Sequence, residues 1–179
     1  MCMATVIYYE GASAKTPEPF DGLKKIGYVV EARKEDNKPK WGGDTVCGVA
    51  FKNAHGTYQF SGMAHVRSGK SPHGWRWEIA VLAAKDVLAG WHPGGEWDRI
   101  RYYMFPMYSV SKNVCNFKKE FAYIGTVGVH EFYAEPTPEE LESLNRKEPE
   151  PPECKVKLEP KKSHVHHHKV KRRHHRDRY

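Results

Sequence analysis

The composition of the chain changes abruptly after Ala134, and this change most limits what the protein can fold into. From residue 136 onward there are six prolines, many charges and no aromatic residue before Tyr179. Such a segment cannot bury enough apolar surface to offset its loss of conformational entropy. We therefore predict one folded domain over residues 1–135, a Pro- and Glu-rich linker over 136–160, and a disordered His-, Lys- and Arg-rich tail over 161–179.

The positive charge of the chain is concentrated in that tail. Residues 161–179 contain eight Lys and Arg and one Asp, which gives +7, the formal net charge of the whole 179-residue chain. A nucleic-acid-binding domain normally spreads its positive charge over a folded face, so the pattern argues against nucleic acid as a partner. It favours contact of the tail with an anionic envelope polymer or a membrane surface, with a merely solvated charge run as the alternative.

The four cysteines are widely spaced and form no CxxC pair, which argues against a zinc ribbon or a thioredoxin motif. No apolar stretch approaches the roughly 20 residues of a membrane-spanning helix. The first ten residues lack the basic start of a signal peptide. We therefore expect synthesis in a reducing cytosol with free thiols. The histidines outside the tail have no metal-ligand spacing, and we expect no metal and no cofactor.

Apolar periodicity predicts several helices and a few short strands. The clearest helix covers residues 75–90, with Trp77, Ala80, Val81, Ala84, Val87 and Leu88 on one face and Gly90 as its C-terminal cap. The other expected elements are helices at 3–10, from Phe20 into the charged run 33–40, at 114–122 and at 138–146, an irregular region with short strands at 41–74, and strands at 100–105 and 127–133.

Glu10 is the strongest candidate for an acid that does chemistry. It ends the apolar stripe of Met3, Val6 and Ile7 and is followed by small residues. Partial desolvation there would favour the protonated carboxyl that a general acid needs. Glycoside cleavage requires such a group at the leaving oxygen. A solvated glutamate at a helix end is the alternative interpretation of this residue alone.

The order of several short segments resembles the SleB-like cell-wall hydrolase family, to which spore-cortex lytic enzymes belong. Residues 7–12 resemble the family's "IYxEARGE" segment, and residues 26–33 its "AVAxVVLNR" helix. The remaining similarities follow in the family's order: residues 44–51 to "xTVCGVVYQ", 58–61 to "CQFSW", 83–90 to "AxxVLAG", 101–103 to "ATxYH" and 123–133 to "IGxHxFY". The resemblance spans almost all of residues 4–133.

The resemblance implies a small lysozyme-like α+β domain, mainly helical with a short antiparallel sheet. Such a domain cleaves the bond between N-acetylmuramic acid and N-acetylglucosamine in peptidoglycan. The expected activity is that of a lytic transglycosylase or muramidase with one catalytic carboxyl group, here Glu10. A phage endolysin or virion-associated lysin is the expected setting, in the host cytoplasm before lysis or in the virion, with virion proteins as further partners.

The same resemblance suggests roles for other residues. Gln59, Phe60 and Ser61 match its cleft segment, where an amide can bind an N-acetyl group and a ring can pack on a sugar. Tyr102, Tyr103 and Tyr133 are expected to line the same groove, and His130 to support the site from behind. The alternatives are that Phe60 and at least one of the tyrosines belong to the core.

The chain also departs from the family pattern. Residues 10–14 lack the Arg and the second Glu of "EARGE", the loop before Phe20 is longer, and Met104 stands where many relatives have His. Glu18 and Asp21 are expected to cap a helix or to be solvated. A structural virion or wall-binding protein without turnover is therefore the alternative function. A zinc amidase and a nucleic-acid-binding protein rank below it.

Overall fold

The computed structural model describes residues 1–12, 18–105 and 112–145, so the predicted tail 161–179 lies outside the described residues. The described part is a mixture of helices and strands, with seven α-helices and two small antiparallel sheets. The α-helices are α1 Cys2–Ile7, α2 Phe20–Asp36, α3 Val46–Ala50, α4 Met63–Arg67, α5 Trp75–Leu88, α6 Lys112–Glu120 and α7 Pro138–Asn145. Shorter helical turns are η1 Tyr8–Ala12, η2 Pro39–Trp41 and η3 Gly95–Arg99.

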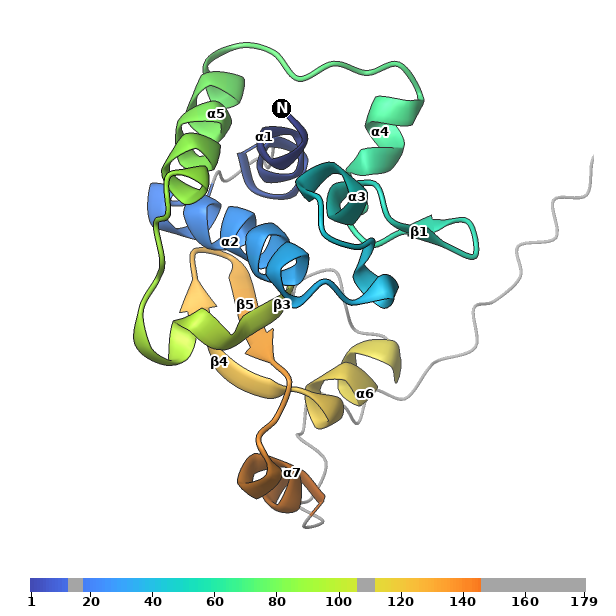
Figure 1. Ribbon diagram of the computed structural model, residues 1–179, viewed down its shortest axis with the longest axis vertical. Coiled ribbons are helices and arrows are strands. Elements are labelled where there is room, and N and C mark those ends of the chain that lie inside the picture. The colour runs from blue at the N-terminus through green and yellow to red at the C-terminus, as the bar shows by residue number, and fades with distance from the viewer. Residues whose placement is uncertain (13–17, 106–111, 146–179) are drawn as a thin grey trace, which may run out of the picture.

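Helix α2 runs through the middle of the domain (Figure 1), with α1 and α5 on one side and the larger sheet on the other. Its apolar stripe forms the centre of the core because Ile26, Val29 and Val30 are fully buried. The predicted helices at 3–10, 20–40 and 75–90 are all present. One predicted core residue is wrong: Leu88 is 55% exposed, because α5 turns that side chain to solvent at its last position.

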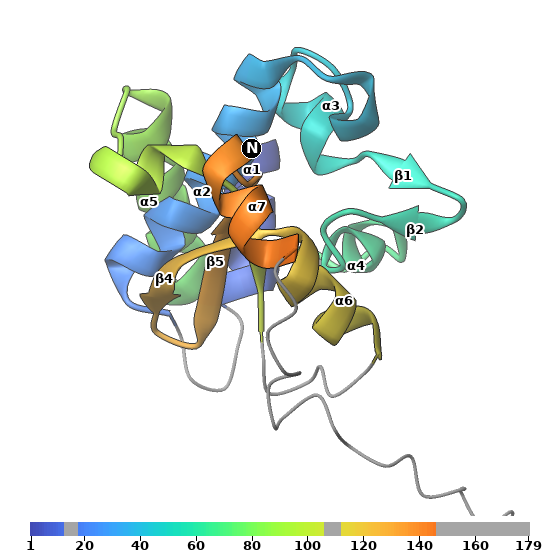
Figure 2. The same ribbon diagram turned by 90° about the horizontal axis from the view of Figure 1, so that it is seen from below.

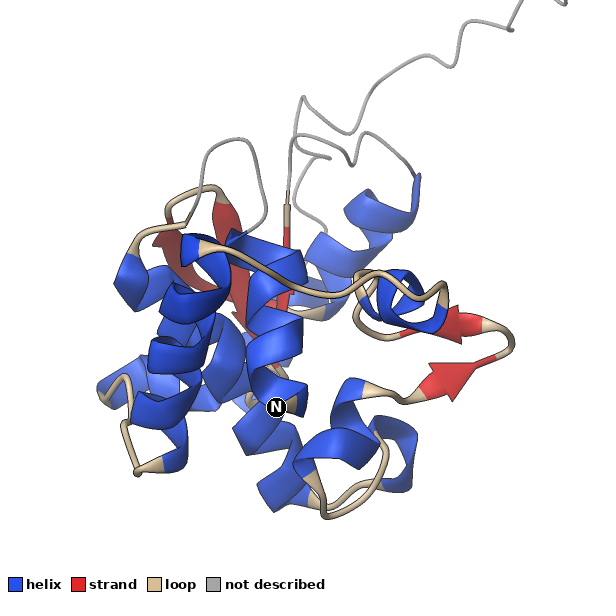
Figure 3. Ribbon diagram, turned by 90° about the horizontal axis from the view of Figure 1, so that it is seen from above, coloured by secondary structure: helices blue, strands red, loops and turns tan. Residues whose placement is uncertain are grey.

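The larger sheet has the order β3-β5-β4, and both pairs are antiparallel. The smaller sheet is a hairpin that extends away from the other elements (Figures 2 and 3). The strands are β1 Asn53–Ala54, β2 Thr57–Tyr58, β3 Ile100–Met104, β4 Ala122–Val127 and β5 His130–Ala134.

Three segments differ from the sequence prediction, and one of them, residues 63–67, forms helix α4 within the region expected to be irregular. Residues 46–50 form helix α3, because the Thr45 side chain caps its start by accepting a hydrogen bond from the Gly48 N–H at 2.9 Å. The predicted single strand at 127–133 is the turn and second arm of a hairpin. The chain reverses at Gly128, whose φ of 58° is a conformation that favours glycine.

Helix α7 lies past the predicted domain boundary at residue 135 but is joined to the domain. Thr137 and Glu140 form a reciprocal capping box, in which the Thr137 N–H donates to Glu140 Oε2 at 2.7 Å and the Glu140 N–H donates to Thr137 Oγ1 at 3.3 Å. Arg99 Nη2 also donates to Glu140 Oε2, at 2.6 Å. Helix α7 is therefore fixed to the rest of the described structure.

The attachment of α7 is expected to weaken in acid. Hydrogen bonds from Arg99 and from the Thr137 backbone lower the pKa of Glu140 to about 2. The stabilisation is complete above the unfolded pKa of about 4.3 and is lost as pH falls through about 2. We expect the NMR amide shifts of residues 138–144 to move toward random-coil values in that window. Glu140→Gln should already show such shifts at pH 7; unchanged shifts in both samples would contradict this role.

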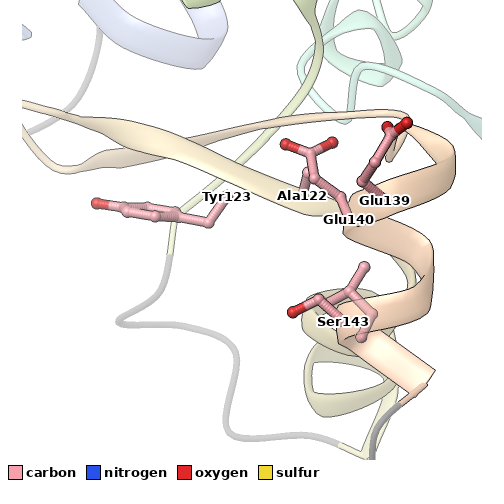
Figure 4. Close-up of a pocket in the computed structure, with 6 residues that line it drawn as sticks. Ala122, Tyr123, Glu139, Glu140 and Ser143 are labelled. Atoms are coloured by element: carbon pink, nitrogen blue, oxygen red, sulfur yellow. The ribbon is translucent and has the colours of Figure 1, made fainter.

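A pocket of about 400 Å³ lies between β4 and α7 (Figure 4). Glu139, Glu140 and Ser143 from α7 border it on one side, and Tyr123 from β4 borders it on the other. Glu140 is already used by Arg99 and Thr137. We therefore interpret this pocket as the seam between α7 and the sheet.

Candidate active site

Glu10 lies where the first helix changes its winding. Helix α1 continues directly into η1, a π-helical turn that holds Glu10 with its side chain half-buried. Single π-helical turns often occur at functional sites. Glu10 Oε1 accepts a hydrogen bond from the Gly62 N–H at 2.8 Å and one from Ser61 Oγ at 3.1 Å. The carboxyl group is thereby oriented by a segment 51 residues further along the chain.

Glycine at position 62 makes this contact possible. A Cβ atom on Gly62 would lie 2.2 Å from Tyr9 Cβ and 3.3 Å from Glu10 Oε1. Any other residue would therefore push the backbone N–H away from the carboxyl group. Ser61 and Gly62 hold Glu10 Oε1, and Tyr103 interacts with the same carboxyl group.

Tyr103, on β3, faces Glu10 from the sheet. Its hydroxyl oxygen is buried and has no hydrogen-bond partner of normal geometry among the described residues. Burial, followed by the negative charge of Glu10, raises the pKa of Tyr103 well above its ordinary value. The phenol therefore stays neutral, and it is close enough to Glu10 to be influenced by the charge of the carboxyl group.

Arg33 lies on the sheet side of α2 and is only 7% exposed. Its guanidinium carbon is 5.1 Å from the ring centre of Phe60, and 5.3 Å from those of Trp41 and Tyr102. Its Nε donates to the Arg101 carbonyl at 2.7 Å, and its Nη1 donates to Gln59 Oε1 at 3.0 Å. Burial lowers the pKa of Arg33.

A pocket of about 270 Å³ opens beside this guanidinium. We call it the Arg33 pocket; its lining residues are Arg33, Trp41, Gln59, Tyr102, Tyr103 and Phe117. Tyr103 connects it to Glu10, because the charges of both Glu10 and Arg33 act on the Tyr103 hydroxyl. The predicted site residues Gln59, Tyr102 and Tyr103 are therefore brought together here.

Gln59 and Tyr102 have partners within the protein. Gln59 Oε1 accepts from Arg33, and Gln59 Nε2 donates to the Lys40 carbonyl at 2.5 Å, so both ends of the amide are occupied. The Tyr102 hydroxyl is 3.4 Å from Glu135 Oε1 and donates to it. Burial, helped by the charge of Glu135, raises the pKa of Tyr102 to about 12. These two residues shape the wall of the pocket.

Phe60 and Tyr133 are buried and cannot contact a ligand. The expected substrate contacts of these two residues are therefore wrong. Each side chain is only 2% exposed. Phe60 packs between Arg33 and Tyr103, and Tyr133 packs against Phe117 and Tyr123 in the sheet region. The apolar face that suggested sugar stacking is used for the core. Ser61, in contrast, is exposed beside Glu10.

The expectation for Glu18 is wrong. Its side chain is buried, and its Oε1 accepts hydrogen bonds from the Val129 N–H at 2.9 Å and from His130 Nδ1 at 2.5 Å. The acid lies against the β4–β5 turn, where a Cβ on Gly128 would be 1.8 Å from Glu18 Oε2. The His130 ring packs edge-on against Tyr103, with centroids 5.3 Å apart. Glu18 and His130 thus support Tyr103 from behind.

Breaking this buried pair is expected to destabilise the domain. His130→Leu leaves the buried Glu18 carboxylate with the Val129 N–H as its remaining donor, which should lower the free energy of unfolding by about 3 kcal/mol. Urea denaturation measures the change. His73→Leu, at an exposed loop position, is the matched control and should cost less than about 0.5 kcal/mol. Adding Glu18→Leu to His130→Leu should recover much of the loss; equal midpoints for all variants would refute the pairing.

A disulfide joins Cys2, at the start of α1, to Cys47 in α3. Cys115 is disulfide-bonded as well. The expectation of free thiols is therefore wrong, because a widely spaced pair can meet in the fold without any local sequence signal. Disulfides persist mainly in oxidising surroundings.

No helix in the described part of the chain is long and apolar enough to cross a membrane. Within the same residues, no three His, Cys, Asp or Glu side chains are grouped so that they could bind a metal ion.

Sequence reasoning missed Arg33 and Glu18, and it also missed Gly62, Trp41 and Phe117. Arg33 continues the stripe of Ile26 and Val30 at helical spacing, and a charged residue on an apolar face was the available signal. For Glu18 no local signal existed, since its partner His130 is 112 residues away. Comparison of the chain with known protein families, with curated proteins and with solved structures found no match.

Proposed function

We propose that the protein is a peptidoglycan glycosidase that cleaves the bond between N-acetylmuramic acid and N-acetylglucosamine, with Glu10 as its single catalytic acid. The observation that carries the proposal is the geometry of Glu10. One carboxyl oxygen is held by Ser61 and Gly62, and the phenol of Tyr103 interacts with the same carboxyl group. Segments resembling the family's motifs, residues 7–12, 59–61 and 101–103, meet at this carboxyl group.

The chemistry follows from this arrangement. Glu10 Oε2 gives its proton to the glycosidic oxygen as the bond from that oxygen to the muramoyl C1 breaks. The muramoyl 6-hydroxyl then attacks C1, and Glu10 takes up the hydroxyl proton, which closes a 1,6-anhydro ring and restores the acid. Attack by water in place of the 6-hydroxyl would give a muramidase product. None of the described residues that line the Arg33 pocket carries a carboxyl group.

The proposal extends to the lysozyme-like character of the domain and to its setting. A helical layer packed on a small antiparallel sheet is compatible with such a domain. We place the protein among phage-type lysins that act on the cell wall. The Cys2–Cys47 disulfide supports action outside a reducing cytosol, and the charge of residues 161–179 supports attachment to an anionic envelope polymer.

The products of digestion test this proposal. The purified protein is incubated with sacculi, and the soluble fragments are analysed by mass spectrometry before and after borohydride reduction. Anhydromuramoyl ends that resist reduction are the expected result, and reducible muramic acid ends would indicate the muramidase form. Release of free peptides with intact glycan, or sedimentation with the wall without soluble fragments, would reject the glycosidase proposal.

A further inference from the structure

The charge of Arg33 is buried without an acid to balance it. No carboxylate of the described residues lies within ion-pair distance of its guanidinium, and Arg101, the charged side chain that affects its pKa, is also a cation. Buried arginines are normally paired, because removing a charge from water is costly. Two neighbouring arginines that are less buried do have acidic partners: Arg101, on β3, pairs with Asp36 at 3.1 Å, and Arg99, at the end of η3, pairs with Glu140.

The surroundings of Arg33 satisfy only part of its guanidinium. Nε and Nη1 donate to fixed protein acceptors, whereas Nη2 makes no hydrogen bond with the described residues. The rings of Trp41, Phe60 and Tyr102 stabilise the cation through their faces. These contacts hold the guanidinium in place beside the Arg33 pocket but supply no anion.

We propose that the Arg33 pocket binds a carboxylate of the substrate next to the bond that Glu10 cleaves. This inference deepens the proposed function, on which it rests, by naming the substrate class: acidic amino sugars. A carboxylate is the group that a fixed guanidinium with an unused N–H recognises best. A neutral N-acetyl group would leave the buried charge unbalanced.

The size and walls of the pocket indicate which carboxylate fits. A volume of about 270 Å³ is too small for a disaccharide but accepts a side group of one sugar. Trp41 and Phe117 offer apolar walls. The lactyl ether of muramic acid has both a methyl group and a carboxylate, and the carboxylate is free where no peptide is attached. Tyr103 lines this pocket and also interacts with Glu10, which links the pocket to the proposed acid.

Binding of small sugars tests the pocket without relying on turnover. Three sugars that differ in their carboxylate are the probes. N-acetylmuramic acid has a free lactyl carboxylate, and N-acetylglucosamine has no carboxylate. In N-acetylmuramoyl dipeptide the lactyl group is blocked by the peptide, which carries a carboxylate of its own. NMR titration of the full chain follows the Arg33 Nε–H signal and gives each dissociation constant. We expect N-acetylmuramic acid to bind at least about tenfold more tightly than N-acetylglucosamine.

Variants separate this proposal from the glycosidase proposal. Arg33→Met should abolish the preference for the carboxylate probes, whereas Lys85→Met, which removes an exposed charge on α5, should keep it. Thermal unfolding checks that both variants fold. Glu10→Gln should bind as the wild type does, so binding without cleavage would reject only the glycosidase. If N-acetylmuramoyl dipeptide binds more tightly than N-acetylmuramic acid, the carboxylate that the pocket binds belongs to the stem peptide. Equal binding of all three sugars would overturn the proposal. So would an unchanged preference for the carboxylate probes in folded Arg33→Met.

Discussion

Glu10→Gln is expected to lower the rate of muropeptide release by about 10³–10⁴-fold while the domain stays folded. The amide oxygen of Gln can still accept the hydrogen bonds from the Gly62 N–H and Ser61 Oγ, so the local structure is preserved. The amide nitrogen that replaces Oε2 cannot deliver a proton to a glycosidic oxygen at neutral pH. The measurement is the initial rate of soluble fragment release from labelled sacculi.

Two controls make this result specific. Glu78→Gln changes an exposed glutamate in the first turn of α5 and should leave the rate within about twofold of the wild type, since surface substitutions away from a site have small effects. The thermal midpoint of Glu10→Gln should match that of the wild type within about 2 °C. If folded Glu10→Gln releases soluble fragments at the wild-type rate, Glu10 is not the catalytic acid.

The long helices were predictable because their signal is local. In α2 and α5 the apolar residues repeat at helical spacing over several turns, and burial follows that spacing. Helix α3 was missed because five residues give too little periodicity, and its start depends on the Thr45 cap. The turn of the hairpin was read as part of its second strand, because residues 127–133 alternate and only Gly128 marks the reversal.

Site residues were predictable where a short local segment identified them. They were missed where their role depends on contacts between segments that are far apart in the sequence. Glu10 and Ser61 stand out in short segments, and the structure brings them within 3.1 Å. The role of Arg33 depends on rings from three other elements, which its own helix cannot reveal. Phe60 has an aromatic ring of the kind that can stack on a sugar, but the ring is buried against Arg33 and belongs to the core.

The double variant Cys2→Ser/Cys47→Ser is expected to lose about 4 kcal/mol of unfolding free energy, because the disulfide closes a loop of 45 residues and so restricts the unfolded chain. For a domain of this size the thermal midpoint should fall by about 10–15 °C. Catalysis at 25 °C should change little, because Met3, Val6 and Ile7 still bury α1, whose continuation carries Glu10. Differential scanning calorimetry under non-reducing conditions measures the shift.

Reductant distinguishes this disulfide from other effects of the substitutions. Reduction should lower the midpoint of the wild type by at least as much as the double variant does, since it opens Cys2–Cys47 together with the bond of Cys115. Peptide mapping without reductant should recover the residues around Cys2 and Cys47 as one linked fragment. Equal thermal midpoints for the wild type and the double variant would show that the Cys2–Cys47 disulfide contributes no stability. If the disulfide does stabilise the fold, the protein is most stable outside a reducing compartment. An enzyme that degrades the cell wall meets its substrate there.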